Sequence, residues 1–236
     1  AEISAFSAAS NYLFVTNAQT DMIDVIDFND PSNMTLVRSI DISTYGVGVN
    51  SVATFGNLMA AAIEANIKTD PGKVVVFDAM GNYLWDVTVG ALPDMVTFTP
   101  DGTKILVANE GEPNDDYSID PEGSISIVDT ASKAVSIADF TAYIGQEATL
   151  ISDGVRIFGP DANVAQDLEP EYITVNKTSD TAYVTLQENN ALAVVDIPTA
   201  TVVNIFPLGT KDHSLWENAF DISKGGIDIR PWPIKG

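Results

Sequence analysis

The sequence predicts an all-β fold, namely a β-propeller built from four-stranded antiparallel blades. Four apolar runs of β type each end on an aspartate, and these aspartates lie 51, 51 and 67 residues apart, at Asp27, Asp78, Asp129 and Asp196. β-Branched and aromatic residues fill the runs, and helical periodicity is nearly absent. A four-stranded unit that recurs at roughly 40–50 residues is typical of a propeller blade.

Each repeat contains four expected strands: two before the run that ends on the aspartate, and one after it, beyond a short polar turn. The expected blades span residues 3–40, 51–89, 94–140 and 170–208. Their first strands are expected at 3–7, 51–55, 95–99 and 172–175, and their second strands at 12–16, 58–63, 104–108 and 182–186. The third strands are the runs themselves, and the fourth are expected at 35–40, 83–89, 134–140 and 201–208. A β-sandwich with coincidental spacing is the competing interpretation, and the repeated strand–turn–strand order favours the propeller.

A fifth repeat is expected to begin at about residue 226, in the segment Gly226-Ile227-Asp228-Ile229-Arg230. A propeller either closes its ring or leaves blade edges exposed. Four blades can close a ring, but a fifth that has begun favours a larger one. We therefore expect residues 1–236 to form a single propeller domain or part of one, with further blades supplied by additional chain or by other copies of this chain.

The composition limits the possible partners. The chain has 33 acidic and 11 basic side chains, a formal net charge of −22 and no cysteine. Nucleic-acid binding draws most of its affinity from Lys and Arg on phosphates, so nucleic acid is not expected as a partner. The longest apolar run, residues 58–63, is far shorter than the roughly 18–20 residues of a membrane helix, so no membrane span is expected. Without cysteine, disulfides and thiolate metal sites are excluded. Divalent cations and basic protein surfaces remain, although acidity by itself also serves solubility.

Loop length and charge indicate which side of the propeller is functional. Connections from strand two to strand three, and from strand four to the next blade, open on one side, which we call the top face. The turns of the opposite bottom face are short and rich in Pro, Gly, Asn and Asp, as turn geometry requires. The top-face connections are long and acidic, at residues 64–72, 90–94, 109–123, 141–171, 187–190 and 209–225. Binding residues concentrate on loops of a rigid scaffold, so the top face is expected to carry the site.

Carboxylates from successive repeats are expected to converge on the top face. Clustered carboxylates repel one another unless a cation neutralises them, and calcium accepts six to eight oxygen ligands of the kind these loops supply. The predicted metal ligands are Glu64, Asp94, Glu110, Glu112, Asp115, Asp116, Asp120, Glu169, Glu171, Glu188 and Asp228. The segment 109–123 lacks EF-hand spacing, so the site would be irregular. Solvated acidic loops without a bound metal are the alternative.

A hydrolytic function is the second possibility. In a metal-dependent phosphoesterase, the same carboxylates would hold metals that polarise the phosphate and activate water. The cationic groups expected near the top face are Arg156, Lys211, His213 and Arg230. His213 is the sole histidine, so a multi-histidine zinc site is excluded, and a structural role competes with one in acid catalysis. The sequence contains no nucleophile elbow, P-loop or dinucleotide fingerprint.

Five motifs resemble those of the bacterial choice-of-anchor I family, which is related to the mesenchyme-specific cell-surface glycoproteins of animals. They lie at residues 92–95, 109–123, 164–172, 186–190 and 211–214, and the resemblance extends from about residue 2 to residue 236. The resemblance implies an exported or surface-attached β-propeller, sometimes labelled alkaline-phosphatase-like, with animal relatives associated with calcium biomineralisation. The family domain continues beyond this sequence, which bears on ring closure. We therefore expect an extracellular or cell-surface calcium-binding module for surface or matrix binding or assembly, with the phosphoesterase, and a purely structural assembly unit, as alternatives.

Overall fold

The sequence repeat corresponds to a repeat of sheets. The computed structural model of the chain describes residues 3–235. Sixteen of its strands form four antiparallel sheets in which neighbouring strands follow one another along the chain. The first blade comprises β1 (Ser4–Ser7), β2 (Tyr12–Asn17), β3 (Met22–Asp27) and β4 (Thr35–Asp41). The second comprises β5 (Val47–Phe55), β6 (Leu58–Glu64), β7 (Pro71–Asp78) and β8 (Tyr83–Ala91).

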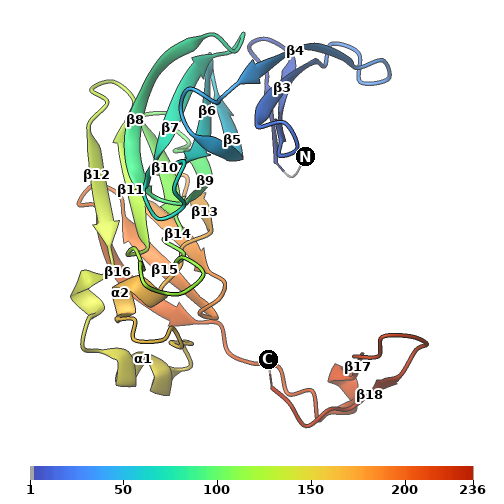
Figure 1. Ribbon diagram of the computed structural model, residues 1–236, viewed down its shortest axis with the longest axis vertical. Helices are drawn as coiled ribbons and strands as arrows, with labels where there is room; N and C mark the ends of the chain where they lie inside the picture. Colours follow the sequence, from blue (N-terminus) through green and yellow to red (C-terminus); the bar gives the residue numbers. More distant parts are fainter. Residues whose placement is uncertain (1–2, 236) are drawn as a thin grey trace.

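The third blade comprises β9 (Pro93–Phe98), β10 (Lys104–Asn109), β11 (Ser124–Asp129) and β12 (Val135–Asp139), and the fourth comprises β13 (Tyr172–Val175), β14 (Thr181–Leu186), β15 (Ala191–Asp196) and β16 (Thr201–Pro207). The four blades succeed one another around an arc (Figure 1). The predicted fold class and all four blades are therefore confirmed. Each predicted closing aspartate is the last residue of the third strand of its blade.

Side-chain alternation along the strands builds a hydrophobic core between each pair of neighbouring blades. On β6, Met59 and Ile63 contribute to the core shared with the first blade, whereas Ala60 and Ala62 contribute to the core shared with the third. β10 divides its residues in the same way between the second and fourth blades, and its Leu106 faces the fourth. Because successive side chains of a strand point to opposite faces, an inner blade needs apolar residues at every position. This explains the uninterrupted apolar run in β6.

The end blades bury one face only. In the first blade Phe14, Ile23 and Val25 are fully buried against the second blade. On the face turned away from the second blade, Phe6 is 45% exposed and Leu36 is 61% exposed. The fourth blade likewise buries alternate residues, namely Ala182, Val184 and Leu186 of β14 and Ala191, Ala193 and Val195 of β15. Both ends of the arc therefore present a partly apolar sheet face.

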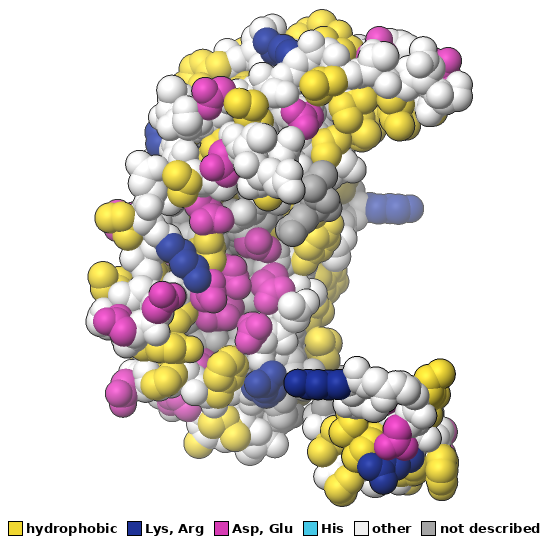
Figure 2. Space-filling view, turned by 45° about the vertical axis from the view of Figure 1, so that its right-hand side comes forward, with side chains coloured by type: hydrophobic (Ala, Val, Ile, Leu, Met, Phe, Trp, Pro, Cys, Tyr) yellow, Lys and Arg dark blue, Asp and Glu magenta, His cyan; other side chains and the backbone are white. Residues whose placement is uncertain are grey.

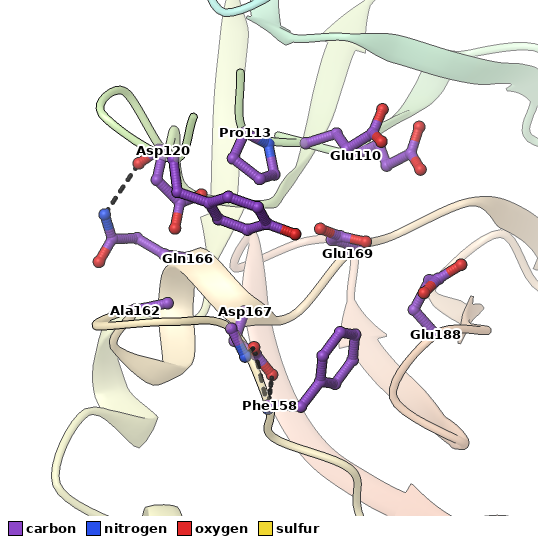
Figure 3. A pocket seen from close by; sticks show the side chains of 12 residues that line it. Glu110, Pro113, Asp120, Phe158, Ala162, Gln166, Asp167, Glu169 and Glu188 are labelled. Carbon is purple, nitrogen blue, oxygen red and sulfur yellow. Dashed lines mark hydrogen bonds between the residues drawn. The ribbon is translucent and has the colours of Figure 1, made fainter. Parts of the chain in front are cut away.

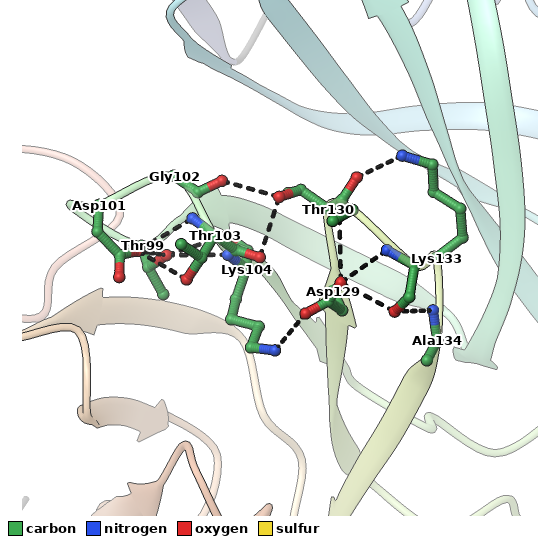
Figure 4. A network of polar contacts seen from close by, with 11 residues as sticks. Thr99, Asp101, Gly102, Thr103, Lys104, Asp129, Thr130, Lys133 and Ala134 are labelled. Atoms are coloured by element: carbon green, nitrogen blue, oxygen red, sulfur yellow. Dashed lines mark hydrogen bonds and ion pairs between the residues drawn. The ribbon is translucent and has the colours of Figure 1, made fainter.

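The bottom face is closed by short turns held by aspartate side chains (Figure 4). Asp101 Oδ1 accepts hydrogen bonds from the Thr99 hydroxyl at 2.6 Å and the Thr103 amide at 3.0 Å. Asp129 Oδ2 lies 2.6 Å from Lys104 Nζ, and its Oδ1 accepts a 2.7 Å bond from the Ser132 amide. These bonds occupy the aspartates within their own turns, as the sequence predicts for structural positions.

The long insertion between the third and fourth blades contains three short helical elements. They are η1 (Thr141–Tyr143), α1 (Glu147–Asp153) and α2 (Val164–Asp167). α2 begins with a capping box, in which the Asn163 side chain accepts from the Ala165 and Gln166 amides and Gln166 bonds back to the Asn163 amide. Val164, Ala165 and Leu168 are fully buried in the core between these two blades. The insertion is thus packed onto the propeller.

The C-terminal residues form a separate ribbon beyond the fourth blade (Figure 1). It contains η2 (Trp216–Asn218), β17 (Phe220–Asp221) and β18 (Ile229–Arg230), and β17 pairs with β18. The expected fifth repeat falls here, and its residues 229–230 pair with this local partner. That the segment begins a fifth blade stays a prediction. Among residues 3–235, no helix has the length and apolarity needed to cross a membrane.

Candidate acidic site on the top face

Three top-face segments enclose a cavity of about 120 Å³ between the third and fourth blades (Figure 3). They are the β10–β11 loop, the insertion that precedes β13, and the β14–β15 connection. Six carboxylates line the cavity: Glu110, Glu112, Asp120, Asp167, Glu169 and Glu188. Pro113, Tyr117, Phe158 and Ala162 add apolar surface. Segments that are far apart in the sequence therefore bring their acids to one place, as predicted for the top face.

A buried hydrogen-bond network fixes the floor of this cavity. The Asp167 carboxylate accepts from the Phe158 amide, at 3.1 Å to each oxygen, and from the Gly159 amide. The fully buried Asn189 donates from Nδ2 to the backbone oxygen of Asp167 at 2.6 Å and to that of Arg156 at 3.0 Å. Its Oδ1 accepts from the Glu169 amide at 3.1 Å. Asn189 therefore ties the insertion to the β14–β15 connection and sets the position of Glu169.

Asp120 marks the opposite wall. Its backbone oxygen accepts a 2.8 Å bond from Gln166 Nε2 of α2. Its side-chain Oδ1 is buried and has no hydrogen-bond partner in the described part of the chain. Burial and the nearby Asp167 raise the pKa of Asp120. A buried carboxylate oxygen without a donor is unfavourable, and a cation would satisfy it.

Burial and mutual repulsion disfavour the charged forms of the cavity acids. Burial is the largest cause that raises the pKa of Glu110 from its ordinary value of 4.5 to about 8. Asp94, Glu112, Glu169 and Glu171 raise it further through their negative charges. Two of these, Asp94 and Glu171, do not line the cavity but lie close enough to act on Glu110. At neutral pH Glu110 is therefore largely protonated in the absence of a cation.

Glu169 responds in the same way. Its pKa rises to about 7, first because of burial and then because of Glu188, Glu112 and the two aspartates of the cavity. Glu171, beside it in sequence, also has a raised pKa, from burial and from Asp94 and Glu188. Protonation would relieve the repulsion, and so would a bound cation.

Few cations balance this charge. Asp and Glu side chains gather in the middle of the molecule, with scattered Lys and Arg around them (Figure 2). The Lys68 ammonium forms an ion pair with Glu112, and both side chains are partly exposed. The Arg156 guanidinium lies 5.0 Å from the ring centroid of Phe158, which lines the cavity. Neither group neutralises Glu110 or Glu169.

Seven of the eleven predicted metal ligands thus share one electrostatic environment. Five line the cavity, namely Glu110, Glu112, Asp120, Glu169 and Glu188, and Asp94 and Glu171 adjoin it.

The other four predicted ligands lie elsewhere. Glu64 ends β6, and its carboxylate lies against Gly48 of β5. Asp115 and Asp116 line a neighbouring depression with Lys68, and Asp116 accepts bonds from the amide and hydroxyl of Ser118 within its own turn. Asp228 belongs to the C-terminal ribbon and lies 3.2 Å from Arg230 Nε.

Sequence reasoning missed the residues that shape the cavity. Asp167 and Asn189 lie inside two of the motifs that carry the family resemblance, but neither is among the eleven predicted metal ligands. The capping box at Asn163 and Gln166 is a local signal that predicts the start of α2 and therefore the position of Asp167. Phe158 and Tyr117 show no pattern in the sequence that would assign them to the site.

The donor set suits a hard cation, but the side chains are not in coordinating positions. Within residues 3–235, no group of three or more Asp, Glu or His side chains is arranged to hold a metal ion. All the acidic ligands offer oxygen, which calcium prefers. Glu188 is exposed and Glu112 is only half-buried, so both can rotate toward the buried acids. The residues fit calcium by chemistry, provided that these side chains turn inward.

None of the four cationic residues considered for catalysis lines this cavity. Lys211, His213 and Arg230 belong to the C-terminal segment and are not among the lining residues. His213 Nδ1 lies 2.7 Å from the backbone oxygen of Asn218, and its ring packs on Phe220 at 4.4 Å between centroids. This geometry gives His213 a structural role in the ribbon.

Comparison with known proteins supports both the family and the fold. The model of the choice-of-anchor I domain matches residues 2–236. No curated protein matches the chain in sequence. Among solved structures, the hydrazine synthase of Kuenenia stuttgartiensis is similar, with a TM-score of 0.53 and 16% identity over 88% of this chain and 74% of that one.

Two further structures resemble the chain at low identity. The Cps50 (Swd1) β-propeller domain of Myceliophteria thermophila gives a TM-score of 0.56 and 11% identity, with coverage of 86% of this chain and 54% of that one. A chain of a nidogen/laminin complex gives 0.53 and 14%, with coverage of 86% and 62%. The chain thus spans between about half and three quarters of these structures. At such identities the likeness shows the propeller fold alone.

Proposed function

Because the chain belongs to the choice-of-anchor I family, we propose that it is an extracellular or cell-surface β-propeller module whose top face binds calcium. The bound ion would hold the loops between the third and fourth blades in one arrangement for binding of a surface or matrix partner. The family membership supports the location at the cell surface.

One observation carries the calcium proposal. Carboxylates from three separate top-face segments line a single cavity, and burial raises the pKa of Glu110 to about 8 and that of Glu169 to about 7. Such groups are poorly stabilised as anions by the protein itself. A divalent cation would supply the missing positive charge and would satisfy the buried Asp120 oxygen.

The expected ligands follow from burial and position. Glu110 and Glu169 would bind the ion from the cavity wall, Asp120 would contribute its buried oxygen, and Glu112 and Glu188 would close over it. Asp167 already accepts two backbone amides, so it would fix the Phe158–Gly159 turn rather than coordinate. Calcium tolerates irregular geometry, which matches a site assembled from loops.

Calorimetric titration of calcium into the intact chain tests this proposal, together with melting curves recorded with and without chelator. We expect heat of binding and a rise in Tm with calcium, since a ligand that binds only the native state stabilises it. Glu110→Gln and Glu169→Gln should each weaken calcium binding at least tenfold. Asp115→Asn removes one charge from the neighbouring depression and should leave the affinity within about twofold.

An unchanged Tm together with no heat of binding would overturn the calcium proposal. Equal weakening by Asp115→Asn would show that general negative charge, rather than this cavity, attracts the ion. Magnesium in place of calcium provides a further comparison, because its stricter octahedral geometry suits a loop-built site poorly.

Arg156 favours phosphoester hydrolysis as a second candidate function. Its guanidinium contacts Phe158 of the cavity wall and, unlike Lys68, is not paired with a cavity carboxylate, so it could hold the anionic group of a substrate over bound metal. Release of p-nitrophenol from p-nitrophenyl phosphate with added calcium or zinc would detect such an activity. Loss of turnover in both Glu110→Gln and Arg156→Met would assign it to this cavity, and absent turnover in the metal-loaded protein would rule it out.

A further inference from the structure

A second cavity lies on the top face, at the junction of the first and second blades. Its volume is about 530 Å³, within the roughly 300–1,000 Å³ of small-molecule sites. The β4–β5 and β6–β7 connections supply most of the lining, which comprises Ser43, Thr44, Tyr45, Gly46, Ala65, Asn66, Ile67, Asp70, Pro71 and Lys73. None of these residues lines the acidic cavity, so the two are separate.

The cavity is lined by hydrogen-bonding groups that the protein leaves available. The side chains of Thr44, Asn66 and Asp70 form no hydrogen bond with any described residue, and neither does the Tyr45 hydroxyl, whereas the Ser43 side chain hydrogen-bonds to Asp41. Together they offer hydroxyl, amide and carboxylate groups that both donate and accept. They therefore face the cavity with their bonding capacity open to a ligand.

The aspartate that borders this region, Asp41, behaves differently. Asp41, at the end of β4, accepts a 2.8 Å bond from the Ser43 amide and a bond from the Ser43 hydroxyl. Its carboxylate serves turn geometry. Asp70 lies in an exposed loop without such a role, which makes its carboxylate available to a ligand.

The cavity carries little charge, in contrast with the acidic cavity. Asp70 is its acid and Lys73 is its base among the lining residues. The Lys73 ammonium is already paired with Asp86 at 2.6 Å, and the Tyr83 hydroxyl donates to the same carboxylate at 2.9 Å. With Lys73 paired to Asp86, Asp70 is the one unpaired charge among the lining residues, which disfavours an anionic ligand and leaves hydrogen-bonding groups as the main contacts.

Tyr45 adds a rigid aromatic wall. Its ring stacks on Tyr83 with centroids 5.7 Å apart and an angle of 14° between planes, and its edge meets Phe77 at 6.3 Å. These contacts hold the ring, so a ligand that packs on it does not have to order it. The negative face of an aromatic ring attracts polarised C–H groups.

From these features we infer that this cavity binds a neutral saccharide. A sugar ring presents hydroxyls around its edge and C–H groups on its faces, which match the unpaired polar side chains and the fixed tyrosine. The site is independent of the calcium proposal and gives the surface module a ligand class of its own, the neutral glycans of a cell surface or matrix.

Saturation-transfer difference NMR on the intact chain tests this inference with five probes: cellotetraose, maltotetraose, xylotetraose, mannotetraose and tri-N-acetylchitotriose. We expect transfer to at least one probe. The double variant Asn66→Ala, Asp70→Ala should weaken its binding at least tenfold, because it removes two exposed polar groups without touching the core. Tyr45→Phe should keep most of the affinity, since it retains the ring and loses only the hydroxyl.

Asp115→Ala, in the neighbouring depression, is the matched control and should bind as the unchanged chain does. Absence of transfer to all five probes would overturn the inference, as would unchanged binding by the double variant. Binding should be equal with calcium and with chelator. Loss of binding in chelator would place the saccharide at the acidic cavity and would also contradict the inference, while calcium binding itself is measured separately by calorimetry.

Discussion

At the scale of single residues, the protonation of Glu110 and Glu169 should control stability near neutral pH. Their pKa values are raised in the folded protein, to about 8 and about 7, whereas unfolding returns them to ordinary values near 4.5. Below pH 4.5 both states hold the protons. As pH rises from about 4.5 to 8, the unfolded state loses its protons first, so stability falls over this window. Carboxyls with lowered pKa, such as Asp101, are ionised throughout it.

We therefore expect the calcium-free protein to have a lower Tm at pH 8.5 than at pH 5.5. Glu110→Gln removes one of these titrations, so the fall should be smaller and the variant should exceed the unchanged chain at pH 8.5. In a chain of this size each kcal/mol shifts Tm by roughly 2–4 °C. Melting curves in chelator across this pH range check the prediction, with the exposed Glu217→Gln as control. An equal fall in Tm between pH 5.5 and pH 8.5 for Glu110→Gln and Glu217→Gln would contradict it.

Asn189 should be important for stability although it bears no charge. It is fully buried, donates to Asp167 and Arg156 and accepts from Glu169, so truncation leaves several polar groups without partners. Unpaired buried groups cost about 1–3 kcal/mol each. Asn189→Ala should lower the free energy of unfolding in urea by about 3 kcal/mol. Asn33→Ala, in an exposed turn, should change it by less than about 0.5 kcal/mol. Equal effects would show that the network contributes little.

At the scale of elements, the attachment of α2 to the third blade depends on Gly123. The Gly123 amide donates to the Ala165 oxygen at 2.9 Å, and a Cβ at residue 123 would lie 2.0 Å from the Leu168 oxygen. Gly123→Ala must therefore displace backbone and should cost about 3 kcal/mol. Faster protease cleavage within residues 141–171 should accompany the loss. Gly225→Ala, where the added Cβ meets no atom within 4 Å, is the control. Unchanged cleavage would mean that the insertion holds without this contact.

The sequence pattern predicts the strands well because each blade repeats the same local chemistry. The second, third and fourth strands match the expected ranges within a few residues. β5 starts at Val47, earlier than expected. Its first residues pair irregularly with β6, because Gly48 has a φ of +61° and the register shifts between Val47 and Ser51. Such irregular pairing has no apolar alternation to reveal it. The helices of the insertion were missed because each is too short for a helical period to show.

The acidic cavity could be predicted only in outline. Charge and loop order indicate that Glu110, Glu169 and Glu188 share a face, because equivalent connections of successive blades open on the same side. Which acids finally meet depends on the insertion, and no repeat fixes its path. Glu64 lies at the end of β6 with its carboxylate against Gly48 of β5, and it does not line the cavity. Asp228 lies in a ribbon that leaves the arc.

At the scale of the whole molecule, the inner blades are shielded on both faces and the end blades on one. Residues of β6, β7 and β10 contribute to two cores each, whereas β1–β4 and β13–β16 each pack on one neighbour. In a chain of stacked repeats, stability is roughly a sum of repeat and interface contributions. A blade with a single interface therefore has less to lose when it opens.

Amide hydrogen exchange should reveal this difference as a gradient along the arc. Amides of β6, β7 and β10 should exchange at least about tenfold more slowly than those of β1, β2, β15 and β16. Uniform protection across all four sheets would instead show that the chain unfolds as one cooperative unit. With a gradient, the molecule frays from its two ends inward: opening of the first blade would disturb the saccharide cavity, and opening of the fourth blade would disturb the acidic cavity.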